Sequence, residues 1–557
     1  MCIISKNRRH KALILVLKQH NRIREVNMSE LLKLFGIDLG TTYSCIAYVD
    51  ETGRPVIVNN SEGTPTTPSV VYFESAQNIV VGEVAKDIAE IEPQKTVQFV
   101  KRQIGKIQEV YNLEGRPISP EEISSYILKK VAQNAEMELG SPVTDVVITC
   151  PAYFGDAEKN STIQAGILAG FNVLAIINEP TAAALSYGAT LGGAEKVLLV
   201  LDLGGGTFDV TVLKVGKSID TICTGGDYYL GGKNWDDSII QYLTDEFSNQ
   251  TGCTDDITEN LETLQSLRGS AEKAKIQLSR KETTTVTVQH DGTRARVELS
   301  REKFNALTAN LLNQVISLTD DVIKQAKEKG ISKFDEVILV GGSCRMPQVM
   351  EAVKEKYGME PKLQDPDAAV AKGAALYAVM KKKVDPTPPT TGDEQMQSLP
   401  PIRYGNGDQL PTITDVTSKT FGVEALDKQK KPIISNLIMR DSSIPIDASR
   451  TYGTEDPNQA SASIKIYEHS SYETEIDLPK DAESLVIGQT ELSLPPNLPE
   501  GAPIKITFKL NENGILEIFA LDLTGNRSVT ATIERKSSLS KAQLDEIKER
   551  NKGIKVI

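Results

Sequence analysis

The chain has 557 residues, more than one hydrophobic core usually supports, so it is predicted to fold as several domains. Its 62 basic and 75 acidic residues give a formal net charge of -13 without a long block of one sign, which argues against nucleic acid as a partner. Six scattered cysteines without a Cys-x-x-Cys pair, and only four histidines, argue against a disulfide framework and a zinc site and favour a reducing cytoplasm.

Residues 1–30 are predicted to form an N-terminal extension. Basic residues flank the apolar run Ala12–Leu17, which is too short to span a bilayer and is not followed by a small-residue cleavage site. Met28 is a candidate for the true start of translation. The rest of the sequence offers no candidate for a transmembrane helix.

Residues 31–382 alternate short apolar strands with longer amphipathic helices, which is typical of a layered α/β domain. Residues 122–139, for example, carry apolar side chains at helical spacing, and Val146–Ile148 has the pattern of a buried strand. Residues 383–414 are rich in proline, threonine and glycine, which predicts a linker.

Residues 415–535 are predicted to form a β-sandwich. Apolar and polar residues alternate along Ile504–Leu510, and Asn513–Gly514 predicts a hairpin turn after this strand. Residues 536–557 predict a helical tail of about three turns, capped by Ser540.

Two similar segments, Phe35–Tyr43 and Val200–Asp209, predict a pair of β-hairpins with glycine tips. In each, an apolar strand leads into Asp-Leu-Gly and a hydroxyl residue, and a second apolar strand follows. Glycines let backbone amides approach a phosphate closely, and threonine hydroxyls add donors. Asp38 and Asp202 would repel a phosphate unless a divalent cation stood between them, so the pair predicts magnesium, held through its waters, and a nucleotide.

The hairpins are not P-loops, because no Gly-Lys-Ser/Thr follows the glycines and a strand comes next instead of a helix. One such hairpin alone would favour a structural turn, but two copies favour phosphate binding. They predict two related lobes around one phosphate chain, and here the sequence resembles the actin, sugar-kinase and heat-shock ATPase superfamily. A third glycine element, Val337–Pro347, predicts a strand, a turn and a helix start, which suit an anion or a nucleoside.

From about Leu34 onward the chain resembles the 70-kDa heat-shock chaperones of the DnaK type. The stretches that carry this resemblance, and that actin and sugar kinases lack, are Val100–Gly105, Pro120–Ser124, Pro151–Phe154 and Ile177–Ala184. The resemblance implies an actin-like α/β ATPase domain of two duplicated lobes, followed by a C-terminal β-sandwich. It implies an ATP-dependent chaperone that hydrolyses Mg-ATP to control its binding of extended apolar segments of client proteins.

The resemblance also implies residue roles. Lys101 would supply positive charge at the γ-phosphate and the attacking water, close to the hydroxyl of Thr207. The implied catalytic residues are Lys101, Glu179, Asp202 and Thr207. The implied metal ligands, for magnesium and potassium, are Asp38, Glu179, Asp202 and Asp209. The implied contacts to ATP or ADP are Gly40, Thr41, Thr42, Tyr43, Gly204, Gly205, Gly206, Thr207, Gly231, Gly232, Glu272, Lys275, Ser279, Gly341, Gly342, Ser343, Arg345 and Asp367.

In the second domain the resemblance implies an apolar groove that binds an extended peptide by backbone pairing. The residues expected to line it are Val423, Leu426, Tyr452, Ala462 and Ile464. Pro151 and Lys159 match the family's allosteric switch positions. Client polypeptides, a J-domain co-chaperone and a nucleotide-exchange factor are the implied partners.

The sequence departs from the family at several positions. Pro411–Thr414 replaces the family's leucine-rich linker, which predicts weaker coupling between the domains. Most of the helical lid is missing, so bound peptide should not be enclosed. Ala175 stands where the family has arginine on its J-domain surface, which predicts a dedicated or altered J-domain partner. Together with Gly155 in place of asparagine, and with Lys233–Trp235, these changes predict a specialised paralogue.

Two other functions fit the hairpins. An actin-like small-molecule kinase would need a catalytic aspartate for a hydroxyl substrate and would leave the β-domain without a purpose. A regulatory protein would hold ATP and one partner with little turnover. Single-turnover hydrolysis with and without peptide separates the regulatory protein from the chaperone, and phosphate transfer to a sugar would identify the kinase.

Overall fold

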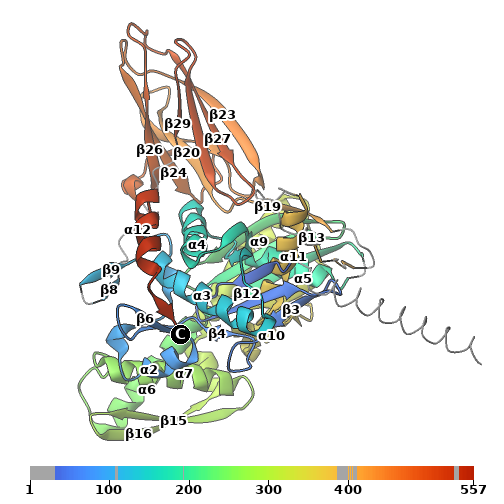
Figure 1. Cartoon of the computed structure of the whole chain (residues 1–557), viewed down its shortest axis with the longest axis vertical. Coiled ribbons are helices and arrows are strands. Elements are labelled where there is room, and N and C mark those ends of the chain that lie inside the picture. The colour runs from blue at the N-terminus through green and yellow to red at the C-terminus, as the bar shows by residue number, and fades with distance from the viewer. Residues whose placement is uncertain are drawn as a thin grey trace, which may run out of the picture.

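The computed structural model describes residues 32–557 except 107–110, 114, 192, 385–398, 401, 403, 406–409 and 532–538. The predicted N-terminal extension and most of the predicted linker lie outside the described residues. Figure 1 shows an α/β body with a narrow β-sandwich standing at one end of it. Mixed α/β sheets followed by two packed β-sheets confirm the predicted fold class.

Lobe I is built on the sheet that contains the first predicted hairpin. Its strand order is β11-β10-β1-β2-β3, with β4 also paired to β2. β1 and β2 are antiparallel, whereas β10 runs parallel to both β1 and β11. The strands are β1 (Phe35–Asp38), β2 (Tyr43–Val49), β3 (Pro55–Val58), β4 (Thr67–Pro68), β10 (Asp145–Cys150) and β11 (Asn172–Asn178). Helices α3 (Pro120–Leu139) and α4 (Asp156–Ala169) pack on this sheet and on each other.

Lobe II repeats this plan with the second hairpin. Its order β18-β17-β12-β13-β14 matches lobe I strand for strand, with the same parallel and antiparallel pairings, which confirms the predicted duplication. The strands are β12 (Lys196–Leu203), β13 (Phe208–Val215), β14 (Ser218–Asp227), β17 (Glu336–Val340) and β18 (Lys362–Leu363). Helix α9 (Ala309–Glu328) packs on β13 and β14, and α10 (Pro347–Tyr357) starts at the predicted proline.

Two helices join the lobes. Helix α5 (Glu179–Gly188) packs on β12 and β13 of lobe II, and α11 (Ala369–Val384) packs on β1, β2 and β10 of lobe I. The two helices also pack against each other, and a Cβ on Gly373 of α11 would overlap the Ala182 carbonyl of α5. Gly36 of β1 is likewise closed off by the backbone of α11. The glycines therefore set how closely the two lobes approach.

Smaller units extend both lobes. Lobe I adds the sheet β30-β6-β5-β7 and the hairpin β8-β9. The elements are β5 (Val71–Phe73), β6 (Asn78–Val81), α2 (Glu83–Ile88), η1 (Pro93–Lys95), β7 (Thr96–Val97), η2 (Val100–Gln103), β8 (Tyr111–Leu113), β9 (Arg116–Ile118) and β30 (Lys555–Val556). Lobe II adds α6 (Gly232–Thr251), α7 (Leu261–Leu278), β15 (Thr283–His290), β16 (Thr293–Ser300), α8 (Arg301–Leu307) and η3 (Gly342–Arg345).

The β-sandwich packs a sheet of order β25-β21-β20-β24-β26 on a sheet of order β23-β27-β28-β29. The first sheet contains β20 (Thr420–Leu426), β21 (Pro432–Ile438), β24 (Ser461–His469), β25 (Glu475–Asp477) and β26 (Val486–Ser493), preceded by η4 (Ala482–Leu485). The second contains β23 (Ile446–Gly453), β27 (Pro503–Leu510), β28 (Leu516–Asp522) and β29 (Ser528–Ala531). The predicted turn at Asn513–Gly514 joins β27 to β28, and Gly514 has a φ of +72°.

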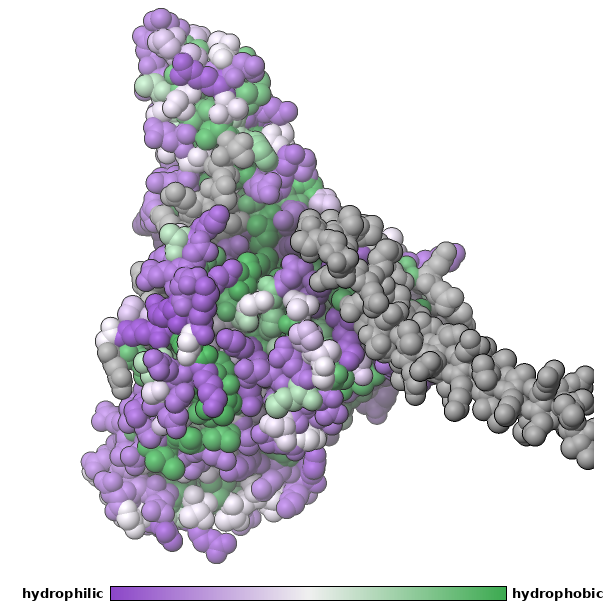
Figure 2. Space-filling view, viewed as in Figure 1, coloured by the Kyte–Doolittle hydropathy of each residue, from purple (hydrophilic) through white to green (hydrophobic). Residues whose placement is uncertain are grey.

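Two segments connect the sandwich to the lobes. Strand β19 (Thr412–Val416) runs parallel to β14, and β22 (Ser443–Ile444) pairs with β19, so both extend the lobe II sheet. Helix α12 (Lys541–Asn551), capped by Ser540 as predicted, packs on α4 of lobe I. The face in Figure 2 is mostly hydrophilic, with hydrophobic residues gathered in a band that descends from the base of the sandwich. Among the described residues, none of the helices is long and apolar enough to cross a membrane.

We expect Gly373→Ala to destabilise the two-lobed α/β body by about 1–3 kcal/mol, because the added methyl group overlaps the α5 backbone. The measurement is denaturant unfolding followed by the fluorescence of Trp235, the single tryptophan, which is fully buried in lobe II. The matched control is Gly269→Ala in α7, where the new Cβ would meet only the end of the Glu90 side chain. Equal unfolding midpoints for the two variants would contradict the close helix packing.

Candidate functional site

The tips of the two predicted hairpins meet between the lobes. A Cβ on Gly205 would overlap the side chain of Thr42, and a Cβ on Gly206 would overlap that of Thr41. Residues from hairpins about 160 positions apart in the sequence are therefore in direct contact, and only glycine fits on the lobe II side. The backbone of Gly206 is in turn covered by Gly231, at the start of α6.

A cavity of about 710 Å³ opens beside these tips, a size that suits a small-molecule cofactor. Most of the predicted nucleotide and metal residues line it: Asp38, Gly40, Thr41, Thr42, Tyr43, Lys101, Glu179, Asp202, Gly204, Gly205, Thr207, Glu272, Lys275, Ser279, Gly341, Gly342, Ser343, Arg345 and Asp367. Four predicted residues, Gly206, Asp209, Gly231 and Gly232, are not in its wall. Gly206 instead accepts two hydrogen bonds from the Arg102 guanidinium through its carbonyl oxygen.

Lys101 and Glu179 form a buried ion pair in the cavity wall. Lys101 lies in η2 of lobe I, which begins directly after Phe99, a residue with a left-handed φ of +60°. Its Nζ is 2.5 Å from Oε1 of Glu179, at the start of α5. Burial acts to lower the pKa of Lys101, but the nearby carboxylates of Glu179 and Asp38 outweigh it and raise the pKa. The lysine is therefore held as a cation next to the hairpin tips.

Three further carboxylates crowd the same region. Burial, with the charge of Glu179, raises the pKa of Asp38 to about 7 and that of Asp209 to about 8. Burial and three neighbouring carboxylates raise the pKa of Asp202 well above its usual value. Asp209 accepts a hydrogen bond from the Tyr153 amide through Oδ1, while its buried Oδ2 has no hydrogen-bond partner.

Carboxylate oxygens are the ligands that hard cations such as magnesium prefer. The positive charge present among these carboxylates does not balance their negative charge, which also favours a bound cation. Within the described ranges, no three acidic, histidine or cysteine side chains converge as direct ligands of one metal ion. A magnesium ion here would therefore be held largely by water molecules and by phosphate oxygens, with Asp38 and Asp202 as outer ligands.

The far end of the cavity is lined by residues of α7 and of the loop before α10. The loop before α10 is fixed by Ser343, whose hydroxyl donates to the Gly204 carbonyl at 2.8 Å, and by the Arg345–Asp367 ion pair at 2.5 Å. Lys275 of α7 pairs with Asp236 at 2.8 Å and donates to the Gly232 carbonyl.

Sequence reasoning missed several residues in the cavity wall: Cys45, Thr66, Asp236, Ile276, Arg280, Met346, Leu363, Pro366 and Val370. Helical spacing from Glu272, Lys275 and Ser279 would have found Ile276 and Arg280.

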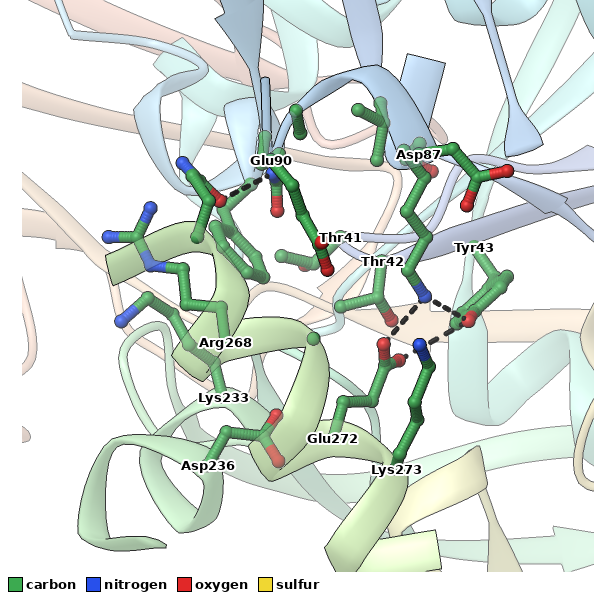
Figure 3. Close-up of a pocket in the computed structure, with 18 of the residues that line it drawn as sticks. Thr41, Thr42, Tyr43, Asp87, Glu90, Lys233, Asp236, Arg268, Glu272 and Lys273 are labelled. Atoms are coloured by element: carbon green, nitrogen blue, oxygen red, sulfur yellow. Dashed lines mark hydrogen bonds and ion pairs between the residues drawn. The ribbon is translucent and has the colours of Figure 1, made fainter. Parts of the chain in front are cut away.

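A polar contact bridges the two lobes beside the cavity, where a second cavity of about 300 Å³ lies against the first. Lys86 of α2 donates to the Tyr43 hydroxyl at 2.7 Å and to Glu272 of α7 at 2.6 Å. Figure 3 shows Tyr43 and Glu272 pointing toward each other, with a hydrogen bond of 3.2 Å between them. These three residues join lobe I to lobe II, and the Lys86 contact was missed because its partner is far away in the sequence.

The residues predicted for the peptide groove are divided between the core and the surface of the sandwich. Val423 and Ile464 are buried in its core, whereas Leu426 is 40% exposed. Tyr452 and Ala462 are partly buried, and the Tyr452 hydroxyl is 3.0 Å from the Ser435 hydroxyl.

The two predicted switch residues are both buried where lobe I meets the sandwich. Pro151 accepts a hydrogen bond from the Phe154 amide through its carbonyl oxygen, in a segment that continues into α4. Phe154 in turn accepts a hydrogen bond from the Ser418 hydroxyl of the β-domain. The Lys159 Nζ lies beside Gly514, in the turn between β27 and β28. Both residues therefore belong to the interdomain contact.

Comparison with known proteins agrees with this geometry. The family model described as Hsp70 protein matches residues 34–114 and 107–555. The chain is 38% identical to the chaperone protein DnaK of Thermosipho melanesiensis over 521 residues, which cover 92% of this chain and 82% of that protein. It is 37% identical to the chaperone protein DnaK of Thermotoga maritima over 523 residues, again 92% and 82% of the two chains. The chain therefore belongs to the Hsp70 family of ATP-hydrolysing molecular chaperones, which bind client polypeptides.

Proposed function

We propose that the ion pair of Lys101 and Glu179 is the centre of ATP hydrolysis in this chaperone. The observation that carries this proposal is a cationic lysine, buried at the point where the two glycine tips meet. A positive charge fixed in a dry site stabilises the negative charge that develops on the departing γ-phosphate. Glu179 orients the lysine, and the Thr207 hydroxyl lies in the same cavity wall.

Magnesium would be held between the phosphates and the carboxylates of Asp38, Glu179 and Asp202, and it would supply charge neutralisation. Asp209, with its unpartnered Oδ2, is suited to a potassium ion beside the phosphates. Burial and neighbouring carboxylates raise the pKa values of Asp38 and Asp209. A cation bound beside each of them would balance this negative charge, which supports both proposed ion sites. The glycine amides of both hairpins would bind the phosphate chain, and α7 with the loop before α10 would bind adenosine.

The β-sandwich, proposed as residues 415–535, would bind extended apolar segments of clients through Val423, Leu426, Tyr452, Ala462 and Ile464. The proposed ATPase domain spans residues 31–382. Residues 383–414 are proposed as a linker, and its last residues, Thr412–Thr414, pair with β14. This pairing supports communication between the domains in spite of the altered linker sequence.

A dedicated J-domain co-chaperone in the cytoplasm, and a nucleotide-exchange factor, complete the proposed cycle. Ala175 is buried, and the amide of the adjacent Ile176 donates to Asn513 of the β-domain. Asn178 and Thr181 both donate to the Asp415 carboxylate. A J-domain that binds here would contact residues that join the two domains instead of an exposed arginine. This difference supports a specialised co-chaperone.

Lys101→Ala should slow single-turnover ATP hydrolysis by at least about 100-fold, because the lost charge acts mainly in the transition state. ATP binding measured by calorimetry should change little. Lys106→Ala is the matched control, because Lys106 follows the same segment but does not line the cavity. Hydrolysis that survives Lys101→Ala would show that another group stabilises the γ-phosphate.

Lys86→Ala should speed nucleotide release by about threefold to tenfold, since the half-buried Lys86–Glu272 pair joins the lobes across the cleft mouth. The measurement is stopped-flow dissociation of a fluorescent ADP analogue. Lys95→Ala is the control, because Lys95 pairs with Glu92 within lobe I. Unchanged release in the Lys86 variant would show that the contact does not gate the cleft.

The purified chain should release a fluorescent apolar peptide rapidly both with ATP and without nucleotide, because α12 packs on lobe I, away from the sandwich. Stopped-flow peptide dissociation checks this expectation, with a lidded relative as the comparison. A nucleotide-free dissociation rate as slow as that of the lidded relative would contradict an open groove. No peptide binding in any nucleotide state would contradict the proposed groove itself.

A further inference from the structure

Residues 539–557 leave the base of the sandwich and lie along lobe I. Figure 1 shows α12 running down past α4, with the chain ending beside β6. Gln164 of α4 exchanges two hydrogen bonds with the backbone of Leu539, at 2.8 and 3.1 Å. The segment is therefore in contact with lobe I before α12 begins.

The end of this segment adds a strand to the lobe I sheet. β30 runs parallel to β6, with Lys555 paired to Asn78 and Val556 paired to Ile79. Three backbone hydrogen bonds join them: Lys555 N to Gln77 O at 2.8 Å, Ile557 N to Ile79 O at 2.8 Å, and Val81 N to Ile557 O at 3.0 Å. An edge strand that would otherwise present unpaired amides and carbonyls is thus covered.

Two apolar side chains hold the added strand against lobe I. Ile554 and Val556 are buried in the lobe I core, together with Val71, Phe73 and Ile79. The neighbouring Lys555 is exposed.

A charged contact lies one turn earlier. Arg550 donates to Oε2 of Glu122 at 2.5 Å, and Glu122 is fully buried. Glu122 also accepts hydrogen bonds from Arg116 and from the Tyr126 hydroxyl. Asn551 is within 3.4 Å of the same Tyr126 hydroxyl, so the end of α12 is tied to the first turns of α3.

We propose that the β6 edge and the Glu122 carboxylate form a second peptide-binding site, separate from the groove of the sandwich. Its ligand is the chain's own segment 539–557, which binds by strand addition, two apolar anchors and one arginine. This assignment does not depend on the proposed catalytic roles, because it concerns a surface of lobe I outside the nucleotide cavity.

Occupation of this site constrains the whole molecule. The sandwich is attached to lobe II through β19 and to lobe I through segment 539–557. The two attachments lie on opposite ends of the sandwich sequence, so the domains separate fully only when both are released, together with direct contacts such as the hydrogen bond between Leu516 and Asp156. We therefore expect the domains to stay docked after ATP hydrolysis for as long as segment 539–557 stays bound.

The first test compares two neighbouring residues of β30 in the full chain. Val556→Asp places a charge in the lobe I core, whereas Lys555→Asp changes an exposed side chain. Amide hydrogen exchange should show loss of protection at Val81 in the Val556 variant alone, since its amide donates to Ile557. Equal protection of Val81 in both variants would overturn the proposal.

The second test adds a fluorescent peptide of residues 539–557 to each full chain and measures its anisotropy. The Val556→Asp chain has an open site and should bind the peptide at least about tenfold more tightly than the unsubstituted and Lys555→Asp chains, in which the tethered segment competes at millimolar effective concentration. A peptide carrying Val556→Asp should not bind this site. Equal binding of both peptides, or equal binding to all three chains, would overturn the assignment.

If Val556→Asp does not fold, Lys555→Pro serves in its place. It keeps both buried side chains but removes the amide that donates to Gln77. The same loss of Val81 protection and the same gain in peptide binding are expected. Retention of Val81 protection in this variant would show that β30 pairing does not hold the segment.

Discussion

The rest of this structure depends on one contact, in which two glycines at the tip of the second hairpin pack against two threonine side chains at the tip of the first. Gly205 and Gly206 approach Thr42 and Thr41 so closely that no other residue would fit. This approach requires that both lobes have the same strand order and that α5 and α11 pack at Gly373. It also forces buried carboxylates together, with pKa values raised by burial, in a place where only cations can relieve the crowding. A lysine and a metal-bound triphosphate are the natural occupants of such a place.

A second close approach joins the ATPase domain to the sandwich. A Cβ on Gly155 would overlap the carboxylate of Glu468, which accepts a hydrogen bond from the Asp156 amide at the start of α4. Burial and the charge of Glu158 raise the pKa of Glu468 to about 8. Asp156 in turn accepts a hydrogen bond from the Leu516 amide at 2.9 Å. The glycine at position 155 is therefore explained by a side chain of the other domain.

Much of the fold and of the nucleotide cavity could be predicted from the sequence because the signals are local. The strand, Asp-Leu-Gly and strand pattern marks each hairpin, Pro347 marks the start of α10, and Ser540 marks the start of α12. The contacts that were missed have partners far away in the chain. Lys86 pairs with Glu272, and β30 pairs with β6, across long stretches of the sequence, and neither pair has a local pattern.

The end of the linker illustrates the same limit. The weaker coupling expected from its sequence stays a prediction, but the pairing of Thr412–Thr414 with β14 was not foreseen, because backbone hydrogen bonds place little demand on side-chain identity. Backbone pairing of this kind can be recognised only when the edge that receives the strand is known.

The most direct measurement of the central claim is a crystal structure of the full chain with magnesium and a non-hydrolysable ATP analogue. The account predicts that the phosphate chain lies in the cavity beside the touching tips, in contact with residues 40–43 and 204–207, with the terminal phosphate facing the Lys101 ammonium group. A nucleotide bound elsewhere, or hairpin tips that separate when it binds, would contradict the account.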